Sequence, residues 1–199
     1  MNGAILAGGS SSRLGGAPKG LLQVGGQRIL DRLVASFETA LGRLPLLVAN
    51  APEAVSWRPG LRTVPDRRPG SGTLGGLLTA VLEAPAPVVC VAWDMPFVPA
   101  PLIAALAEGL GNADVCIPAS GSRRGLEPLC AGYGPRTGPA MADALDRGDL
   151  RAIAFHTAVR VAVLPETLLR RFGEPERLFF NVNTADELRR ANEMTGLAS

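Results

Sequence analysis

The sequence has few of the residues on which several classes of protein depend. Its 199 residues include one histidine, three cysteines and 5% aromatic residues, and the formal net charge is only +2. The cysteines are widely spaced and form no CxxC pair, so neither a zinc site nor a disulfide framework is expected. The balanced charge gives no support for nucleic acid or a membrane surface as a partner. Because no apolar run approaches the ~18 residues of a membrane span, we expect a soluble, cytoplasmic protein.

The sequence does contain many short apolar runs that alternate with amphipathic stretches. The runs predict buried strands at 3–6, 44–49, 61–64, 87–93, 114–118, 128–133 and 159–164. The amphipathic stretches predict helices at 27–41, 74–83, 101–109, 136–147 and 185–194. This alternation predicts an α/β fold, with a Rossmann-like, mostly parallel sheet that helices cover on both faces. In such folds ligands bind beyond the carboxyl ends of the strands.

A glycine-rich segment follows the first predicted strand. It begins at Leu6 and contains four glycines, three serines and Arg13 before it reaches Lys19. Glycines allow backbone N–H groups to approach phosphate oxygens, and the hydroxyl and cationic side chains add donors and positive charge. The segment therefore predicts a loop that binds a nucleoside triphosphate, in preference to a plain flexible turn.

Two better-known phosphate motifs do not fit. A Walker A loop requires Gly-Lys-Ser/Thr, whereas Lys19 is followed by Gly20. The glycine spacing of a Rossmann fingerprint occurs at Gly70, Gly72 and Gly75, but there it follows an Arg-Arg-Pro stretch and not a clean strand. We therefore place the phosphates at the first loop.

An acidic residue, Asp94, stands at the end of the apolar run 87–93. A carboxylate in such a place costs free energy unless it is paired, hydrogen-bonded or bound to a cation. Magnesium takes oxygen ligands and commonly bridges phosphates. Asp94 is therefore a candidate magnesium ligand, and the alternative is that it caps the helix that starts near Pro99.

Two asparagines, Asn181 and Asn183, precede the last predicted helix. Thr184 and Glu187 have the spacing of a capping box, which explains the start of that helix. The capping box does not account for the asparagines, which makes them candidates for a functional site.

Together these segments resemble the molybdenum cofactor guanylyltransferases, within the wider group of GT-A-like nucleotidyltransferases. The matching segments cover most of the chain in the right order and include Leu6–Gly9, Ser12–Gly16, Lys19–Leu22, Gly72–Gly76, Glu127–Ala131, Gly148–Arg151 and Asn181–Leu188. The Asp94 segment resembles the family's Cys-Asp-Met-Pro-Phe element, with Trp93 in place of the cysteine.

The resemblance implies an enzyme that transfers GMP from GTP to molybdenum-molybdopterin. Pyrophosphate would leave, and the guanine dinucleotide form of the molybdenum cofactor would be the product. Mg²⁺ is the implied cofactor, and transient contact with cofactor carriers or acceptor enzymes is also implied. We expect one nucleotidyltransferase domain over residues 1–199, in which about 1–100 bind the nucleotide and about 101–199 bind the acceptor.

The resemblance also implies roles for individual residues. It assigns catalysis to Arg13, Lys19 and Asp94. It assigns nucleotide binding to Leu6, Ala7, Gly8, Gly9, Ser10, Lys19, Asn50, Asp66 and Asp94, with Asp94 as the metal ligand. It assigns acceptor binding to Arg151, Asn181 and Asn183.

One departure from the family leaves alternatives open. Pro18 precedes Lys19, where the family usually has aspartate, and Pro-Lys is common in sugar nucleotidyltransferases. A sugar-phosphate nucleotidyltransferase therefore stays open, as do a molybdenum cofactor cytidylyltransferase and a non-catalytic nucleotide-binding partner. Release of pyrophosphate that depends on a nucleotide would separate an enzyme from a binding protein.

Overall fold

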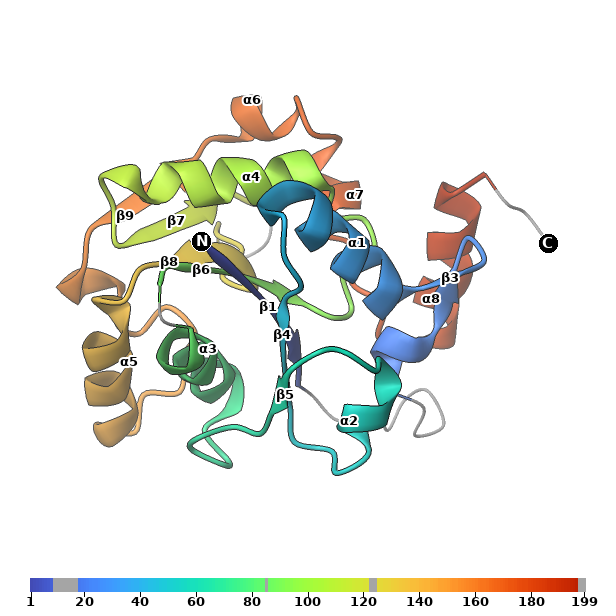
Figure 1. Ribbon diagram of the computed structural model, residues 1–199. Coiled ribbons are helices and arrows are strands. Elements are labelled where there is room, and N and C mark those ends of the chain that lie inside the picture. The colour runs from blue at the N-terminus through green and yellow to red at the C-terminus, as the bar shows by residue number, and fades with distance from the viewer. Residues whose placement is uncertain (9–17, 85, 122–124, 197–199) are drawn as a thin grey trace.

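The computed structural model describes residues 1–8, 18–84, 86–121 and 125–196. Its centre is a seven-stranded sheet in the order β5-β4-β1-β6-β8-β7-β9 (Figure 1). The strands of this sheet are β1 (Asn2–Ala7), β4 (Leu46–Ala49), β5 (Thr63–Val64), β6 (Val88–Ala92), β7 (Val115–Pro118), β8 (Cys130–Tyr133) and β9 (Val161–Leu164). Two further short strands, β2 (Gln23–Val24) and β3 (Gln27–Arg28), form a separate hairpin.

The direction of the strands decides where the candidate residues meet. β1 is parallel to both β4 and β6, and β4 is parallel to β5. The carboxyl ends of these four strands therefore lie at one edge of the sheet. β8 runs antiparallel to β6 and β7, whereas β7 and β9 are parallel to each other.

Helices cover both faces of the sheet (Figure 1). On one face α1 (Ile29–Leu41) packs against α4 (Ala100–Glu108), and on the other α3 (Gly72–Glu83) packs against α5 (Thr137–Asp146). The apolar residues of α1 recur at helical spacing and all are buried, namely Ile29, Leu30, Leu33, Val34 and Phe37. Each face has its own core, and aliphatic side chains dominate both.

Shorter elements complete the chain between and after these helices. They include a 3₁₀ turn at Lys19–Leu21 and the helices α2 (Ala54–Trp57), α6 (Glu166–Leu169) and α7 (Pro175–Leu178). The last helix is α8 (Ala185–Met194), which contacts the hairpin strand β2. In the part of the chain that the structure describes, none of the helices has the length and apolar character to cross a membrane.

The predicted α/β fold, a mostly parallel sheet between two layers of helices, is confirmed. The strand expected at 44–49 begins only at Leu46, because Pro45 has no N–H to offer a neighbouring strand. The antiparallel direction of β8 and the four-residue helices were not predicted. Such short segments contain too few residues to show a period.

Candidate active site

A pocket of about 530 Å³ opens at the carboxyl ends of the parallel strands. The residues that line it come from β1, β4 and β6 with the positions directly after them, from the 3₁₀ turn at Lys19, the segment after β5, the start of α3 and the residue before β8. They are Leu6, Ala7, Gly8, Lys19, Val48, Ala49, Asn50, Asp66, Gly70, Gly72, Thr73, Gly76, Ala92, Trp93, Asp94 and Leu129. Seven of the predicted site residues therefore share one cavity: Leu6, Ala7, Gly8, Lys19, Asn50, Asp66 and Asp94.

A charged cluster occupies one end of the pocket. Nζ of Lys19 donates to Oδ1 of Asn183 at 2.6 Å and lies 3.8 Å from Oδ2 of Asp94. The Lys19 and Asp94 side chains are only 10% and 16% exposed. Charges this little exposed interact more strongly than surface charges, because less water screens them. The fold thus joins three of the predicted residues in one polar contact.

Asp94 is held in an environment that disfavours its charge. Burial raises the pKa of the carboxyl above its usual value, and the nearby Lys19 ammonium opposes that shift. Its second oxygen, Oδ1, is buried and has no hydrogen-bond partner among the described residues. A buried carboxylate oxygen without a partner is unusual, and a cation at that oxygen would satisfy it.

The position of Lys19 depends on close packing behind it. A Cβ atom at Gly20 would lie 2.5 Å from Cε3 of Trp93, so only glycine fits there without displacement. Trp93 in turn stacks on Trp57, with ring centroids 5.0 Å apart and ring planes inclined by 25°. Trp93, which stands where the resembling family has cysteine, therefore forms the support for the backbone that holds Lys19.

Asn183 reaches the cluster through the start of α8. Its backbone N–H donates to Oε2 of Glu187 at 2.8 Å, and Thr184 caps the helix by accepting from the N–H of Glu187 at 3.2 Å. The predicted cap by Thr184 is confirmed, but the Glu187 carboxylate accepts from the N–H of Asn183 and not from that of Thr184, as a capping box would require. The neighbouring N–H of Val182 donates to the carbonyl of Asp94 at 2.9 Å, which ties this segment to the end of β6.

A second polar pair forms the other end of the pocket. Nδ2 of Asn50 donates to Oδ2 of Asp66 at 2.8 Å, and the backbone N–H of Asp66 donates to Oδ1 of Asn50 at 2.8 Å. The two bonds close a ring between the ends of β4 and β5. Oδ1 of Asp66 accepts no hydrogen bond from the described residues, and a Cβ atom at Gly76 would lie 3.7 Å from it.

Sequence reasoning missed one wall of the pocket. Gly70, Gly72, Thr73 and Gly76 line it at the start of α3. The glycine spacing at Gly70 and Gly72 does not identify the phosphate loop, and the resemblance includes Gly72–Gly76 without giving these residues a role. The strand expected at 61–64 is present as β5 but has only two residues.

Two of the predicted acceptor residues lie apart from the charged cluster. Arg151 lines a neighbouring pocket of about 840 Å³ that shares Thr73 and Leu129 with the first. Its guanidinium donates to Asp149 at 2.6 and 2.9 Å, and these hydrogen bonds lower the pKa of Asp149 to about 2. Asn181 donates to the carbonyl of Phe179 at 2.9 Å, a local contact.

Three predicted site residues, Gly9, Ser10 and Arg13, lie outside the described residues. Within the described residues, no group of three His, Cys, Asp or Glu side chains is arranged to hold a metal ion. Asp94 is therefore a single protein carboxylate at this site. Any divalent ion bound there would need further ligands from a substrate or from water.

The chain is similar to proteins with assigned names along nearly its whole length. Residues 3–197 match the family described as the MobA-like NTP transferase domain. A relative from Pelotomaculum thermopropionicum, named "Probable molybdenum cofactor guanylyltransferase", is 35% identical over 96% of this chain and 92% of its own. A relative from Serratia proteamaculans, named "Molybdenum cofactor guanylyltransferase", is 28% identical over 100% of this chain and 98% of its own.

Solved structures give the same result for the fold. Molybdopterin-guanine dinucleotide biosynthesis protein A from Archaeoglobus fulgidus superposes with a TM-score of 0.82, at 26% identity over the whole of both chains. A 2-C-methyl-D-erythritol 4-phosphate cytidylyltransferase from Thermus thermophilus superposes at 0.68 with 19% identity, covering 99% of this chain and 100% of its own, which shows the shared fold. The predicted family is confirmed: the chain belongs to the MobA-like NTP transferases and is a nucleotidyltransferase.

Proposed function

We propose that this enzyme transfers GMP from GTP to molybdopterin and releases pyrophosphate. The observation that carries the proposal is the buried Lys19–Asp94–Asn183 cluster, which faces the same pocket as the Asn50–Asp66 pair. One end can stabilise charge on phosphates and the other can hold a base. Relatives named molybdenum cofactor guanylyltransferase support the choice of substrates.

The size and the lining of the pocket suit a nucleotide. A volume of about 530 Å³ falls within the range of small-molecule sites. Gly8 follows β1 and brings backbone to the cavity without a side chain, as a phosphate contact requires. In our proposal the triphosphate lies between Gly8 and Lys19. Gly9, Ser10 and Arg13 would add their N–H, hydroxyl and guanidinium groups to the same phosphates.

Asp66 is the candidate reader of the base. Its Oδ1 is a hydrogen-bond acceptor that no described residue occupies, and Asn50 fixes the carboxylate through Oδ2. Guanine presents adjacent N–H donors at N1 and N2, which a carboxylate can accept. Cytosine and uracil do not present two adjacent donors, so this acceptor favours GTP over CTP or UTP.

The chemistry follows from position and charge. An oxygen of the terminal phosphate of molybdopterin forms a bond to the α-phosphorus of GTP. The bond from the α-phosphorus to the bridging oxygen breaks, and pyrophosphate leaves. Lys19 stabilises the negative charge that builds up on the phosphates. A general base is unnecessary, because a phosphate monoester is already largely ionised near neutral pH.

Mg²⁺ fits the residues that are present. The buried Oδ1 of Asp94, which has no donor among the described residues, is the kind of oxygen that Mg²⁺ prefers, and the phosphates of GTP would complete the ligand set. The ion, when bound, neutralises part of the phosphate charge. Asp94 would hold the ion, and Lys19, which Asn183 fixes by a hydrogen bond, would contact the phosphates beside it.

The neighbouring pocket is the proposed acceptor site. Arg151 lies there with an exposed guanidinium, suited to a phosphate, and the shared residues Thr73 and Leu129 connect the two cavities. Asn181 and Asn183 would contribute from the side of α8. We place the reaction in the cytoplasm, with transient contact to cofactor carriers or acceptor enzymes and without nucleic acid or membrane partners.

The test is a transfer assay with separate donors and acceptors. Purified protein is incubated with Mg²⁺, molybdopterin and either GTP, CTP or UTP, and pyrophosphate release is measured. We expect release with GTP only, and only when molybdopterin is present. Release with CTP and not GTP, or with a sugar 1-phosphate in place of molybdopterin, would overturn the proposal.

A further inference from the structure

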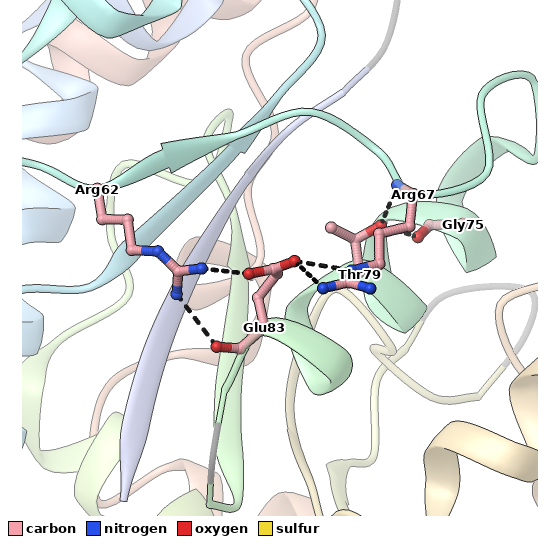
Figure 2. A network of polar contacts seen from close by, with 5 residues as sticks. All are labelled: Arg62, Arg67, Gly75, Thr79 and Glu83. Atoms are coloured by element: carbon pink, nitrogen blue, oxygen red, sulfur yellow. Dashed lines mark hydrogen bonds and ion pairs between the residues drawn. The ribbon is translucent and has the colours of Figure 1, made fainter.

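A network of polar contacts lies behind the loop that carries Asp66 (Figure 2). It joins Arg62 and Arg67, one on each side of β5, to Thr79 and Glu83, which are four residues apart on α3. None of these four residues is in the lining of the nucleotide pocket. The proposed chemistry therefore leaves the network without a role.

Thr79 fixes the backbone directly after Asp66. Its side chain is fully buried, and its hydroxyl accepts the backbone N–H of Arg67 at 2.9 Å (Figure 2). The same hydroxyl donates to the carbonyl of Gly75 at 2.9 Å, so its orientation is set from both sides. A buried hydroxyl with both bonds made is rigid, because rotation would break at least one of them.

Glu83 holds the side chain of the same arginine. Its Oε1 accepts from Arg67 at 2.6 and 2.7 Å. Its other carboxylate oxygen and its backbone carbonyl accept from Arg62 (Figure 2). The hydrogen bond from Arg67 lowers the pKa of Glu83 and outweighs the opposite effect of burial, so this carboxylate stays charged near neutral pH.

We infer that Thr79 and Glu83 are positioning residues, which hold Asp66 at the donor base by fixing Arg67 to α3. Among the residues that the structure describes, Asp66 is held on its other side only by the exposed pair with Asn50, so the support comes from α3. The same helix supplies Gly72, Thr73 and Gly76 to the pocket, so the contacts of Thr79 and Glu83 with Arg67 set the distance between two walls of one cavity. The inference rests on the proposed function, because it assigns Asp66 to the guanine.

Thr79→Val is the principal test, with kcat and KM for GTP measured together with the preference for GTP over ITP. Valine has nearly the same shape and removes the acceptor of the Arg67 N–H. We expect KM for GTP to rise about tenfold, the size of one net hydrogen bond, with kcat within about twofold. ITP lacks the 2-amino group, so the preference for GTP should shrink. Thr79→Ser keeps the hydroxyl and should have the wild-type KM for GTP and the wild-type preference for GTP over ITP.

Arg62→Gln is the matched control, because it removes a partner of the same Glu83 on the side of β5 away from Asp66. It should lower the thermal midpoint and leave both KM and the GTP/ITP preference unchanged. The inference would be overturned if Thr79→Val had the wild-type KM for GTP and GTP/ITP preference. It would also be overturned if Thr79→Val and Arg62→Gln changed these two quantities equally.

Two further measurements keep the inference separate from the proposed function. If Thr79→Val does not fold, Arg67→Gln replaces it, because the Arg67 side chain is 54% exposed and its loss should leave the fold intact. A KM for GTP that Arg67→Gln leaves at the wild-type value would then reject the inference. If the wild type releases no pyrophosphate from GTP, the proposed function fails. GTP affinity measured by calorimetry then decides the inference: weaker binding by Thr79→Val supports it, and equal binding or no binding by the wild type rejects it.

Discussion

The two ends of the pocket hold their polar groups in opposite ways. At the Lys19 end the ion pair is only 10% and 16% exposed, and the stacked Trp57 and Trp93 lie behind it. At the Asn50 end both hydrogen bonds are exposed, and the support comes from a network one layer further out. One end is little exposed and tightly packed, whereas the other is exposed and held by hydrogen bonds and ion pairs.

This difference fits the roles that we propose for the two ends, phosphate stabilisation at Lys19 and base recognition at Asn50 and Asp66. Charge that develops on phosphates is best stabilised by preorganised groups in a site that excludes water. A base can be read by hydrogen bonds near the surface, where the loss of one bond is partly replaced by water. We therefore expect substitutions at the buried end to lower kcat and those at the exposed end to raise the KM of the donor.

Asp94→Asn should give the largest effect. It keeps the shape of the side chain and removes the charge. We expect a loss of several kcal/mol of transition-state stabilisation, so the rate of transfer should fall on the order of a thousandfold. The thermal midpoint near neutral pH should not fall, because burial raises the pKa of Asp94 and the ionised form therefore opposes folding there. The assay is steady-state pyrophosphate release, together with a thermal melt.

Asp114→Asn is the matched control for that variant. Asp114 also adjoins a strand of the sheet, but hydrogen bonds from Arg160 lower its pKa, so its ionised form favours folding. This stability is present near neutral pH and would be lost as the pH falls through the pKa of Asp114. The variant should melt at a lower temperature and keep its activity. If Asp94→Asn still transferred GMP at the wild-type rate, Asp94 could not be the magnesium ligand that the reaction needs.

Lys19→Ala should give the second largest effect. Loss of one preorganised donor typically costs about 2–4 kcal/mol of transition-state stabilisation, and we expect this to appear mainly in kcat. Asn183→Ala is the comparison, since it leaves the Lys19 charge in place and removes only the partner at 2.6 Å. If both variants were equally impaired, Asn183 would have a role of its own, beyond holding Lys19.

The features of the site that depend on one helix or one strand could be predicted from the sequence. The period of Ile29, Leu33 and Phe37 places α1, and the apolar run before Asp94 places β6 and the acid at its end. The capping-box spacing of Thr184 and Glu187 locates the start of α8. Each of these signals lies within one element, where spacing alone fixes the side of a helix or the end of a strand.

What could not be predicted depends on contacts between distant segments. Lys19 and Asn183 are 164 residues apart, and no periodicity specifies their hydrogen bond. The packing of Gly20 on Trp93 requires the sheet order, which places β6 beside β1. The resemblance includes Gly72–Gly76 but gives them no role, because their place in the pocket wall depends on how the start of α3 packs beside the strand ends.

Asn50→Ala should have the smallest effect and tests the exposed end directly. The variant removes both hydrogen bonds to Asp66, but water can reach the freed groups, so we expect a loss of about 0.5–1.5 kcal/mol in GTP binding. KM for GTP should therefore rise roughly two- to thirteenfold, with kcat close to wild type. A fall in kcat as large as that of Lys19→Ala would mean that the two ends are coupled, because the base contact would then set the position of the α-phosphorus. Unchanged KM and kcat would mean instead that α3 alone holds Asp66 in place, through the contacts of Thr79 and Glu83 with Arg67.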